Sequence, residues 1–333
     1  MSLRIGAVLL LSVAAGAAEI PKPPGKLVAI GGYRLHLNCI GKGRPTVVLS
    51  PGGGDFSFDW YLVQKDVSRF ARVCSYDRSG QAWSDPGPQP ATMHQEAHDV
   101  RAALQAAHER GPYLLVGHSL GGVVMRVFAN MYPDDTAGIV LVDATSPDTT
   151  LGMNGKLVHL RELAKPGPLP GVHTLSSGPP KLFSDAELKE AAEKRKGEGE
   201  PKIGSPYDRL PPAIQKLRVW ALSLSPRAAS GDDYMAEEFN DLYQQLASQP
   251  RPFGSKPLIT IVGTRFDAKP TEVTQETWDA LMLEKVQQKR EYARLSDNGE
   301  VVEDAKAGHH VQLDDPDTVV NAIRKVAARV GNK

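Results

Sequence analysis

Residues 113–131 read YLLVGHSLGGVVMRVFANM. The apolar run from Tyr113 to Gly117 predicts a strand buried on both faces, and Gly121–Met131, which ends before Pro133, predicts a helix. Between strand and helix lies GHSLG, a match to the pattern G-x-S-x-G. Small residues around such a serine permit a strained turn that exposes the hydroxyl above a sheet. The sequence therefore predicts a nucleophilic Ser119 on a strand-to-helix turn.

The pattern continues on both sides of this stretch. Further apolar runs predict strands at Thr46–Ser50, Val73–Tyr76, Gly138–Asp143, Pro257–Gly263 and 300–305, and helical patterns fall at His94–Arg110, Trp278–Leu295 and Asp317–Val330. Strands that alternate with helices imply crossover units, which predicts a doubly wound, mostly parallel α/β sheet. Two shorter runs, Lys26–Ile30 and Tyr33–Cys39, predict a hairpin that turns at Gly31 and Gly32.

The alternation is interrupted from Pro147 to Lys256, where Pro- and Gly-rich loops surround polar helices. We interpret residues 147–256 as an inserted helical lid and residues 19–146 and 257–333 as the core. Residues 1–18 read MSLRIGAVLLLSVAAGAA and predict a signal peptide, and hence a secreted or periplasmic protein. The apolar stretch is shorter than the roughly 20 residues of a membrane span, so we expect no stable span after cleavage.

Composition narrows the function classes. The 333 residues carry 39 basic and 39 acidic side chains, so no net charge attracts the chain to nucleic acid. A hydrophobic content of 41% is enough for a large core without a structural metal. The sequence yields no prediction of oligomeric state.

Several motifs occur in one order along the chain. They are LSPGGG at residues 49–54, SYDRSG at 75–80, GHSLGG at 117–122 and AGH at 307–309, followed by Asp315 and Pro316. With these motifs the chain resembles the α/β-hydrolase superfamily, which implies an eight-stranded α/β-hydrolase fold. A serine hydroxyl needs a base to take its proton. The resemblance assigns this role to His309, in preference to the adjacent His310.

The resemblance leaves the third catalytic residue open between two carboxylates. Asp267 follows a late strand, the usual family position, but lies one residue beyond the common spacing. Asp143 follows the strand Gly138–Asp143, a position from which some relatives supply the acid. The resemblance also implies an oxyanion hole built from the backbone N–H groups of Leu120 and of Gly53 or Gly54.

Two cysteines are present, Cys39 and Cys74. In the α/β-hydrolase fold that the chain resembles, the strands predicted to carry these cysteines are antiparallel neighbours. The resemblance therefore implies a possible disulfide between Cys39 and Cys74. Both thiols lie in predicted strands away from Ser119, so we do not expect a cysteine nucleophile.

These observations predict a serine hydrolase that cleaves a carboxylic ester, or a related acyl bond, of a small molecule through an acyl-enzyme on Ser119. We expect neither a cofactor nor a metal. Two alternatives stay open: an aminopeptidase of the same fold and a non-catalytic ligand-binding protein. Acidic lid residues could hold the amine of a peptidase substrate, namely Asp232, Asp233, Glu237 and Glu238. Apolar lid residues could shape the pocket, namely Trp220, Leu222, Tyr234, Phe239 and Tyr243.

Overall fold

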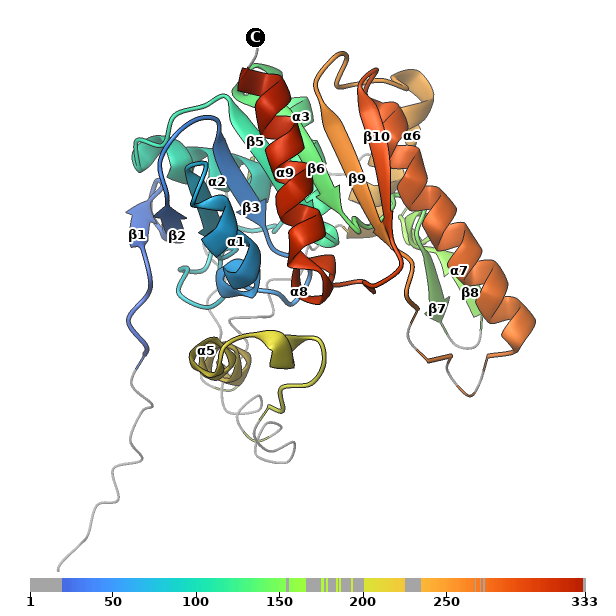
Figure 1. Cartoon of the computed structure of the whole chain (residues 1–333). Coiled ribbons are helices and arrows are strands. Elements are labelled where there is room, and N and C mark those ends of the chain that lie inside the picture. Colours follow the sequence, from blue (N-terminus) through green and yellow to red (C-terminus); the bar gives the residue numbers. More distant parts are fainter. Residues whose placement is uncertain are drawn as a thin grey trace, which may run out of the picture.

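A computed structural model describes residues 20–153, 156–165, 201–224, 235–266, 268–269 and 273–331, together with a few single positions between them. Eight of its strands form one sheet in the order β1-β2-β4-β3-β5-β6-β9-β10 (Figure 1). Their bounds are β1 (Lys26–Ala29), β2 (Arg34–Ile40), β3 (Thr46–Ser50), β4 (Val73–Tyr76), β5 (Tyr113–His118), β6 (Thr136–Val142), β9 (Leu258–Gly263) and β10 (Gly299–Asp304). A separate hairpin pairs β7 (Thr150–Met153) with β8 (Lys156–His159).

The strand β2 runs antiparallel to both of its neighbours, β1 and β4, and the other pairs of the large sheet are parallel. Every residue of β3, β4, β5 and β9 is buried, as their continuous apolar sequences require. The prediction of an eight-stranded, mostly parallel α/β sheet is confirmed.

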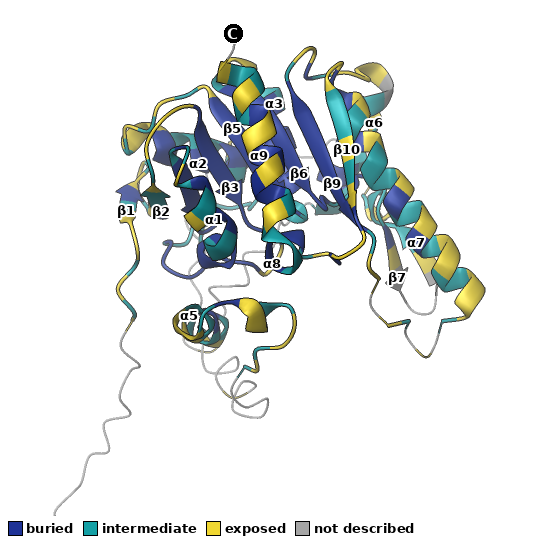
Figure 2. Cartoon of the chain, viewed as in Figure 1, coloured by how far each residue is buried: buried dark blue, intermediate teal, exposed yellow. Residues whose placement is uncertain are grey.

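Helices cover both faces of this sheet (Figures 1 and 2). One face packs against α1 (Tyr61–Val67), α8 (Val311–Asp314) and α9 (Pro316–Gly331), and the other against α2 (Met93–Ala106), α3 (Leu120–Met131) and α6 (Met235–Ser248). The helix α7 (Gln275–Arg290) lies beside β9. Two apolar cores, one on each face, therefore hold the strand ends in fixed positions.

Most predicted boundaries lie close to the observed ones, and the differences have local causes. The strand β6 begins at Thr136, two residues before the predicted start, because Thr136 pairs with Tyr113 across an irregularity in the β5–β6 register. The helix α7 begins three residues earlier than predicted because the side chain of Thr274 caps it. The final turn, 291–295, is a tighter 3-10 helix.

The predicted lid region is described in parts. Among its described residues, two α-helices pack on the core: α6 buries Phe239 and Leu242, and α5 (Pro212–Ser223) lies against the short helix Ser57–Trp60. The predicted helix at 185–195 lies outside the described residues except for isolated positions. The division into core and lid stays a prediction.

The two cysteines lie on neighbouring strands, β2 and β4, near one edge of the sheet. Cys39 on β2 lies opposite Cys74 on β4 in the antiparallel register, and the two sulfur atoms form a disulfide.

None of the helices in the described part of the chain has both the length and the apolar character that a membrane crossing requires.

Candidate active site

Ser119 occupies the sharp turn between β5 and α3. Its backbone angles, φ +50° and ψ −121°, are rare for a residue with a side chain. A Cβ atom added to Gly121 would lie 2.5 Å from the carbonyl oxygen of Pro51, so only glycine fits there. The N–H of Ser119 donates to the carbonyl of Val142 on β6 at 3.1 Å. Close packing therefore holds the serine hydroxyl at the carboxyl end of the sheet.

A continuous chain of contacts leads from this hydroxyl to a buried carboxylate. His309, in the loop between β10 and α8, lies with Nε2 3.0 Å from Oγ of Ser119 and Nδ1 2.6 Å from Oδ2 of Asp143. Asp143 directly follows β6, and its Oδ1 accepts the N–H of Gly263 at 3.0 Å. Three strand ends thus bring a hydroxyl, an imidazole and a carboxylate into line.

Lys289 adds a fourth member that the sequence analysis missed. This residue on α7 lies with Nζ 2.5 Å from Oδ2 of Asp143, the same oxygen that contacts His309. Burial alone would raise the pKa of Asp143, but the hydrogen bond from His309 and the charge of Lys289 outweigh burial and lower it. Asp143 is therefore ionised at neutral pH although it is only 1% exposed.

The pKa of His309 is also lowered from its ordinary value. Desolvation by the surrounding protein is the largest cause, His118 and Lys289 add to it, and the hydrogen bond to Asp143 opposes it. About 44% of the side chain still faces solvent, so water screens each of these effects. The imidazole is neutral at pH 7 and can accept a proton.

The other candidate for the base, His310, has different partners. His310 contacts the hydroxyl of Tyr207 through Nε2 at 2.7 Å, and burial, followed by the charge of His118, lowers its pKa to about 4. The structure therefore brings His309, and not its neighbour, to Ser119. Asp267 lies outside the described residues.

His118, the residue before the nucleophile, connects the turn to the histidine loop. Its Nε2 lies 2.9 Å from the backbone oxygen of His309, and its Nδ1 lies 3.0 Å from Oδ2 of Asp55. Both His118 and Asp55 are almost fully buried. These two contacts fix the backbone that carries His309 relative to the backbone that carries Ser119.

A buried ionic cluster joins α5 to this region. Arg218 forms ion pairs with Asp59 and Asp55, the second at 3.6 Å, and its guanidinium lies 3.4 Å from the ring centre of Tyr207. Burial, with a smaller contribution from Asp55, raises the pKa of Asp59 to about 8. The cluster therefore anchors α5 beside the loop that follows β3.

That loop carries the expected oxyanion glycines. A Cβ atom on Gly53 would lie 3.9 Å from Leu120, so the loop passes directly over the start of α3, where first-turn N–H groups have no partner within the helix. Arg78, which the sequence analysis did not single out, donates to the carbonyl oxygens of Pro51 and Gly52, the first at 3.0 Å. These two hydrogen bonds from Arg78 hold the backbone of the loop that carries Gly53 in place.

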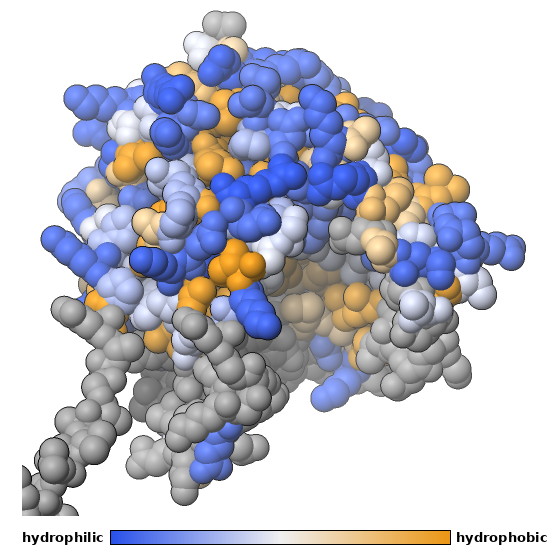
Figure 3. Space-filling model, turned by 60° about the horizontal axis from the view of Figure 1, so that its bottom comes forward, coloured by the Kyte–Doolittle hydropathy of each residue, from blue (hydrophilic) through white to orange (hydrophobic). Residues whose placement is uncertain are grey.

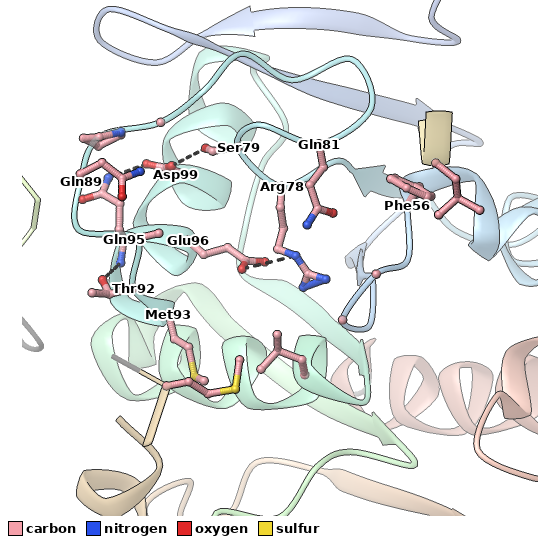
Figure 4. A pocket seen from close by; sticks show the side chains of 18 residues that line it. Phe56, Arg78, Ser79, Gln81, Gln89, Thr92, Met93, Gln95, Glu96 and Asp99 are labelled. Carbon is pink, nitrogen blue, oxygen red and sulfur yellow. Dashed lines mark hydrogen bonds and ion pairs between the residues drawn. The ribbon is translucent and has the colours of Figure 1, made fainter. Parts of the chain in front are cut away.

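Two pockets flank the contact chain. The first, here called the oxyanion-side pocket, has a volume of about 390 Å³, and the residues that line it include Gly53, Leu120, Arg78, Glu96, Gln95 and Leu222 (Figure 4). The second, the acid-side pocket, has a volume of about 250 Å³, and its lining includes His309, Asp143, Thr145, Lys285, Lys289 and Trp278. Viewed from below, apolar side chains lie in a recess that hydrophilic ones border (Figure 3).

The apolar residues expected to shape the pocket have different positions. Leu222 lines the oxyanion-side pocket, whereas Phe239 is buried in the core and Trp220 packs against Trp83 with ring centres 4.9 Å apart. Tyr243 lies under the guanidinium of Arg161. Tyr234 lies outside the described residues.

The acidic residues of the same region are occupied or not described. Glu238 is 1% exposed and accepts the backbone N–H of Met93, at 2.9 Å and 3.0 Å, at the start of α2. Glu237 is buried and accepts the N–H of Lys165 at 3.3 Å. Asp232 and Asp233 lie outside the described residues.

Within the described residues, one cluster with metal-ligating atoms lies beside the site. It consists of Asp55, His118 and His310, whose ligand atoms lie within 4.8 Å of one another. Arg218 already supplies a positive charge to Asp55, and the ring nitrogens face Tyr207 and the backbone of His309. The cluster is better suited to holding α5 and the histidine loop than to binding a cation.

Comparison with known proteins identifies the family. The model of the alpha/beta hydrolase family matches residues 47–322. Among solved structures, the enol-lactonase from Burkholderia xenovorans LB400 aligns with a TM-score of 0.59 at 18% identity, over 91% of this chain and all of that one. A thermophilic esterase from Thermogutta terrifontis aligns with a TM-score of 0.58 at 22% identity, over 91% and 97%. At these identities the likeness shows the fold alone.

A sequence relative corrects one expectation. An uncharacterized vacuolar membrane protein of Saccharomyces cerevisiae is 31% identical over 130 residues, which cover 34% of this chain and 20% of that protein. This relative does not fit a secreted or periplasmic protein, so the prediction of that location is wrong. Residues 1–18, on which the prediction depended, lie outside the described residues. The chain spans less than a third of the length of the first curated relatives that it matches.

Proposed function

The chain belongs to the alpha/beta hydrolase family, and from this premise we propose that it is a serine hydrolase that cleaves a carboxylic ester of a small molecule. The single observation that carries the proposal is the contact chain from Ser119 through His309 to Asp143. A neutral imidazole between a hydroxyl and an ionised carboxylate is what acyl transfer through serine requires.

In the proposed reaction Oγ of Ser119 attacks the ester carbonyl while Nε2 of His309 takes the hydroxyl proton. The tetrahedral oxyanion accepts hydrogen bonds from the backbone N–H groups of Leu120 and Gly53. Collapse of this intermediate breaks the bond to the alcohol, which leaves with the proton from His309. Water then attacks the acyl-enzyme by the same route, and the acid is released with the serine restored.

The role of Asp143 follows from its contacts. Its carboxylate accepts from Nδ1–H of His309, so the other ring nitrogen is free to accept the serine proton. It also stabilises the imidazolium that forms in each step. Lys289 shares Oδ2 of Asp143 and lowers the basicity of the pair, which keeps His309 unprotonated before the attack.

The aminopeptidase alternative has less support. Glu238 on α6 is buried against the first turn of α2 and Glu237 accepts a backbone N–H, so neither carboxylate is available to a substrate amine. A non-catalytic binding protein has no need for the contact chain at Ser119. The ester reaction is therefore the function that we favour.

The test is hydrolysis of para-nitrophenyl esters, from acetate to decanoate, by the protein and its Ser119→Ala variant. Ser255→Ala is a matched control, because Ser255 is exposed and far along the chain from the turn. We expect turnover that survives in the control and vanishes in Ser119→Ala. A fluorophosphonate should label the protein once, at Ser119, as mass spectrometry of the peptides can show. Equal turnover in all three proteins, or a label at another residue, would refute the proposal.

A further inference from the structure

The acid-side pocket has an electrostatic feature that the proposed reaction does not use. Lys285 and Lys289 are four residues apart on α7, so their side chains lie on one face of the helix and both line the pocket. Like charges at this spacing destabilise a helix. Lys289 is neutralised by Asp143 at 2.5 Å, but Lys285 is not neutralised in this way.

Lys285 is half-buried, and among the described residues it has no hydrogen bond or ion pair. Burial, and then the neighbouring charge of Lys289, lowers its pKa. The adjacent carboxylate of Glu284 accepts from Thr150 at 2.6 Å and from Gln288 at 2.8 Å, so it is held by other partners. The ammonium group of Lys285 is therefore available to an acceptor that a ligand supplies.

The other residues that line the acid-side pocket indicate the chemistry of such a ligand. Trp278, Met282 and Val286 form an apolar side, and Thr145 reaches from this pocket to Oγ of Ser119 at 3.3 Å. The pocket therefore combines an apolar surface and a cation on one helix, and Thr145 connects it to the nucleophile. Its volume of about 250 Å³ is below the range of roughly 300 to 1,000 Å³ that holds drug-sized ligands, so the group it takes is small.

Asp143 does not make the pocket repel anions. Its two oxygens are occupied by His309, Lys289 and the N–H of Gly263, which compensate its charge. Arg265, which also lines the pocket, adds a further positive charge, although it pairs with Asp314 at 2.7 Å. The charged side chains that line the pocket itself, Lys285, Lys289, Arg265 and Asp143, have a positive net charge, which the neighbouring carboxylates Asp314 and Glu284 reduce.

We propose that Lys285 binds a carboxylate of the substrate, so that the preferred substrates are short esters that carry a second, ionised carboxyl group. This inference rests on the proposed serine hydrolase function and adds its substrate class. The carboxylate could belong to the acyl part, as in a half-ester of a dicarboxylic acid, or to the alcohol part. In both cases a short aliphatic or aromatic spacer would lie in the acid-side pocket beside Val286.

The experiment compares substrates of matched length that differ in charge. One pair is the para-nitrophenyl half-ester of glutaric acid against para-nitrophenyl pentanoate, and a second is para-carboxyphenyl butyrate against phenyl butyrate. Each is assayed with the unmodified protein, Lys285→Met, Lys285→Arg and the control Lys65→Met, since Lys65 is exposed on α1. Methionine keeps the length of the side chain and removes its charge.

We expect Lys285→Met to lower kcat/KM for at least one anionic ester by about 10- to 100-fold, the range of a charge-assisted hydrogen bond. The neutral esters should change less than about twofold, and Lys285→Arg should restore part of the loss. The pair that responds identifies whether the acyl or the alcohol part carries the carboxylate. An equal effect of Lys285→Met on anionic and neutral esters, or no effect on either, would overturn the inference.

A binding measurement separates this inference from the proposed reaction. Calorimetric titration with glutarate, in Ser119→Ala and in Ser119→Ala with Lys285→Met, needs no turnover. If no ester is hydrolysed but glutarate binding depends on Lys285, the ester function fails and the anion site stands. If esters are hydrolysed but glutarate binding and anionic-ester turnover are both indifferent to Lys285, the anion site fails and the hydrolase stands.

Discussion

Replacement of Lys289 by methionine should move the acid limb of the pH–rate profile to higher pH. Lys289 contacts the oxygen of Asp143 that also contacts His309, and it helps to hold the pKa of His309 below its ordinary value. Loss of the Lys289 ammonium group removes a positive charge that repels the imidazolium form of His309. It also leaves Oδ2 of Asp143 to interact with His309 alone. Both effects raise the pKa of His309, so the base is protonated over a wider range of acidic pH.

The size of the effect follows from the geometry. Nζ of Lys289 and Nδ1 of His309 lie 2.5 Å and 2.6 Å from one oxygen, so they are at most about 5 Å apart. Two unit charges at about 5 Å interact by roughly 3 kcal/mol at an effective dielectric constant of about 20. That energy corresponds to about two pKa units. Since 44% of the His309 side chain is exposed, solvent screening reduces the expected shift to about one unit.

The assay is kcat/KM for a neutral ester as a function of pH, followed by pH-stat titration so that the signal does not depend on the ionisation of a chromophore. The acid limb of kcat/KM reports the pKa of the base in the free enzyme. Lys325→Met is the control, because Lys325 pairs with Glu300 on the surface, and its profile should be unchanged. An acid limb that stays in place, or moves to lower pH, in Lys289→Met would show that this charge does not tune His309.

Three further predictions concern the acid, the disulfide and the ionic cluster. Asp143→Asn should lower kcat about 10³- to 10⁴-fold with an unchanged circular dichroism spectrum, and a loss below tenfold would exclude Asp143 as the residue that orients the base. Joint replacement of Cys39 and Cys74 by serine should lower the free energy of unfolding in urea by on the order of 3 to 4 kcal/mol, the value for opening a loop of 35 residues; a protein equally stable with and without reductant would contradict this. Arg218→Met should destabilise the protein by about 3 to 5 kcal/mol, because it removes the cation that pairs with the buried, ionised carboxylate of Asp55 and the hydrogen bond that Asp59 accepts. Thermal unfolding at constant pH measures the last change, and an unaltered melting temperature would argue against it.

The fold could be predicted from the sequence to a large extent because its strands and helices have clear periodic patterns. The apolar run of β5, the glycines beside Ser119 and the caps of the helices are local signals, and the structure follows them to within a few residues. The choice between Asp143 and Asp267 could not be predicted from local patterns. It depends on how far the loop of His309 reaches across the sheet, and no short stretch of sequence determines that distance.

The site residues that the sequence analysis missed have roles that depend on which residues lie next to them in the folded protein. Lys285 and Lys289 lie on a helix whose sequence resembles any solvated helix, and only the packing of α7 beside β9 brings Lys289 to Asp143 and Lys285 into the lining of the same pocket. Arg78 and Arg218 are likewise ordinary arginines until the loops fold around them. Surface charge could be predicted for these residues, whereas their buried contacts arise from tertiary structure alone.

The bond between Cys39 and Cys74 also determines how the molecule responds to mechanical force. Tension on the chain before Lys26 would break the hydrogen bonds between β1 and β2 one pair after another, since the two strands are antiparallel and joined by a turn. The force would then reach β2, whose pairing with β4 begins at Leu37 and is interrupted two residues later by a covalent bond. Extension stops there in the oxidised protein, and the load passes to the middle of the sheet. In an optical trap, a reductant should therefore lengthen the first extension step, while the strands that carry Ser119 and Asp143 stay folded behind it.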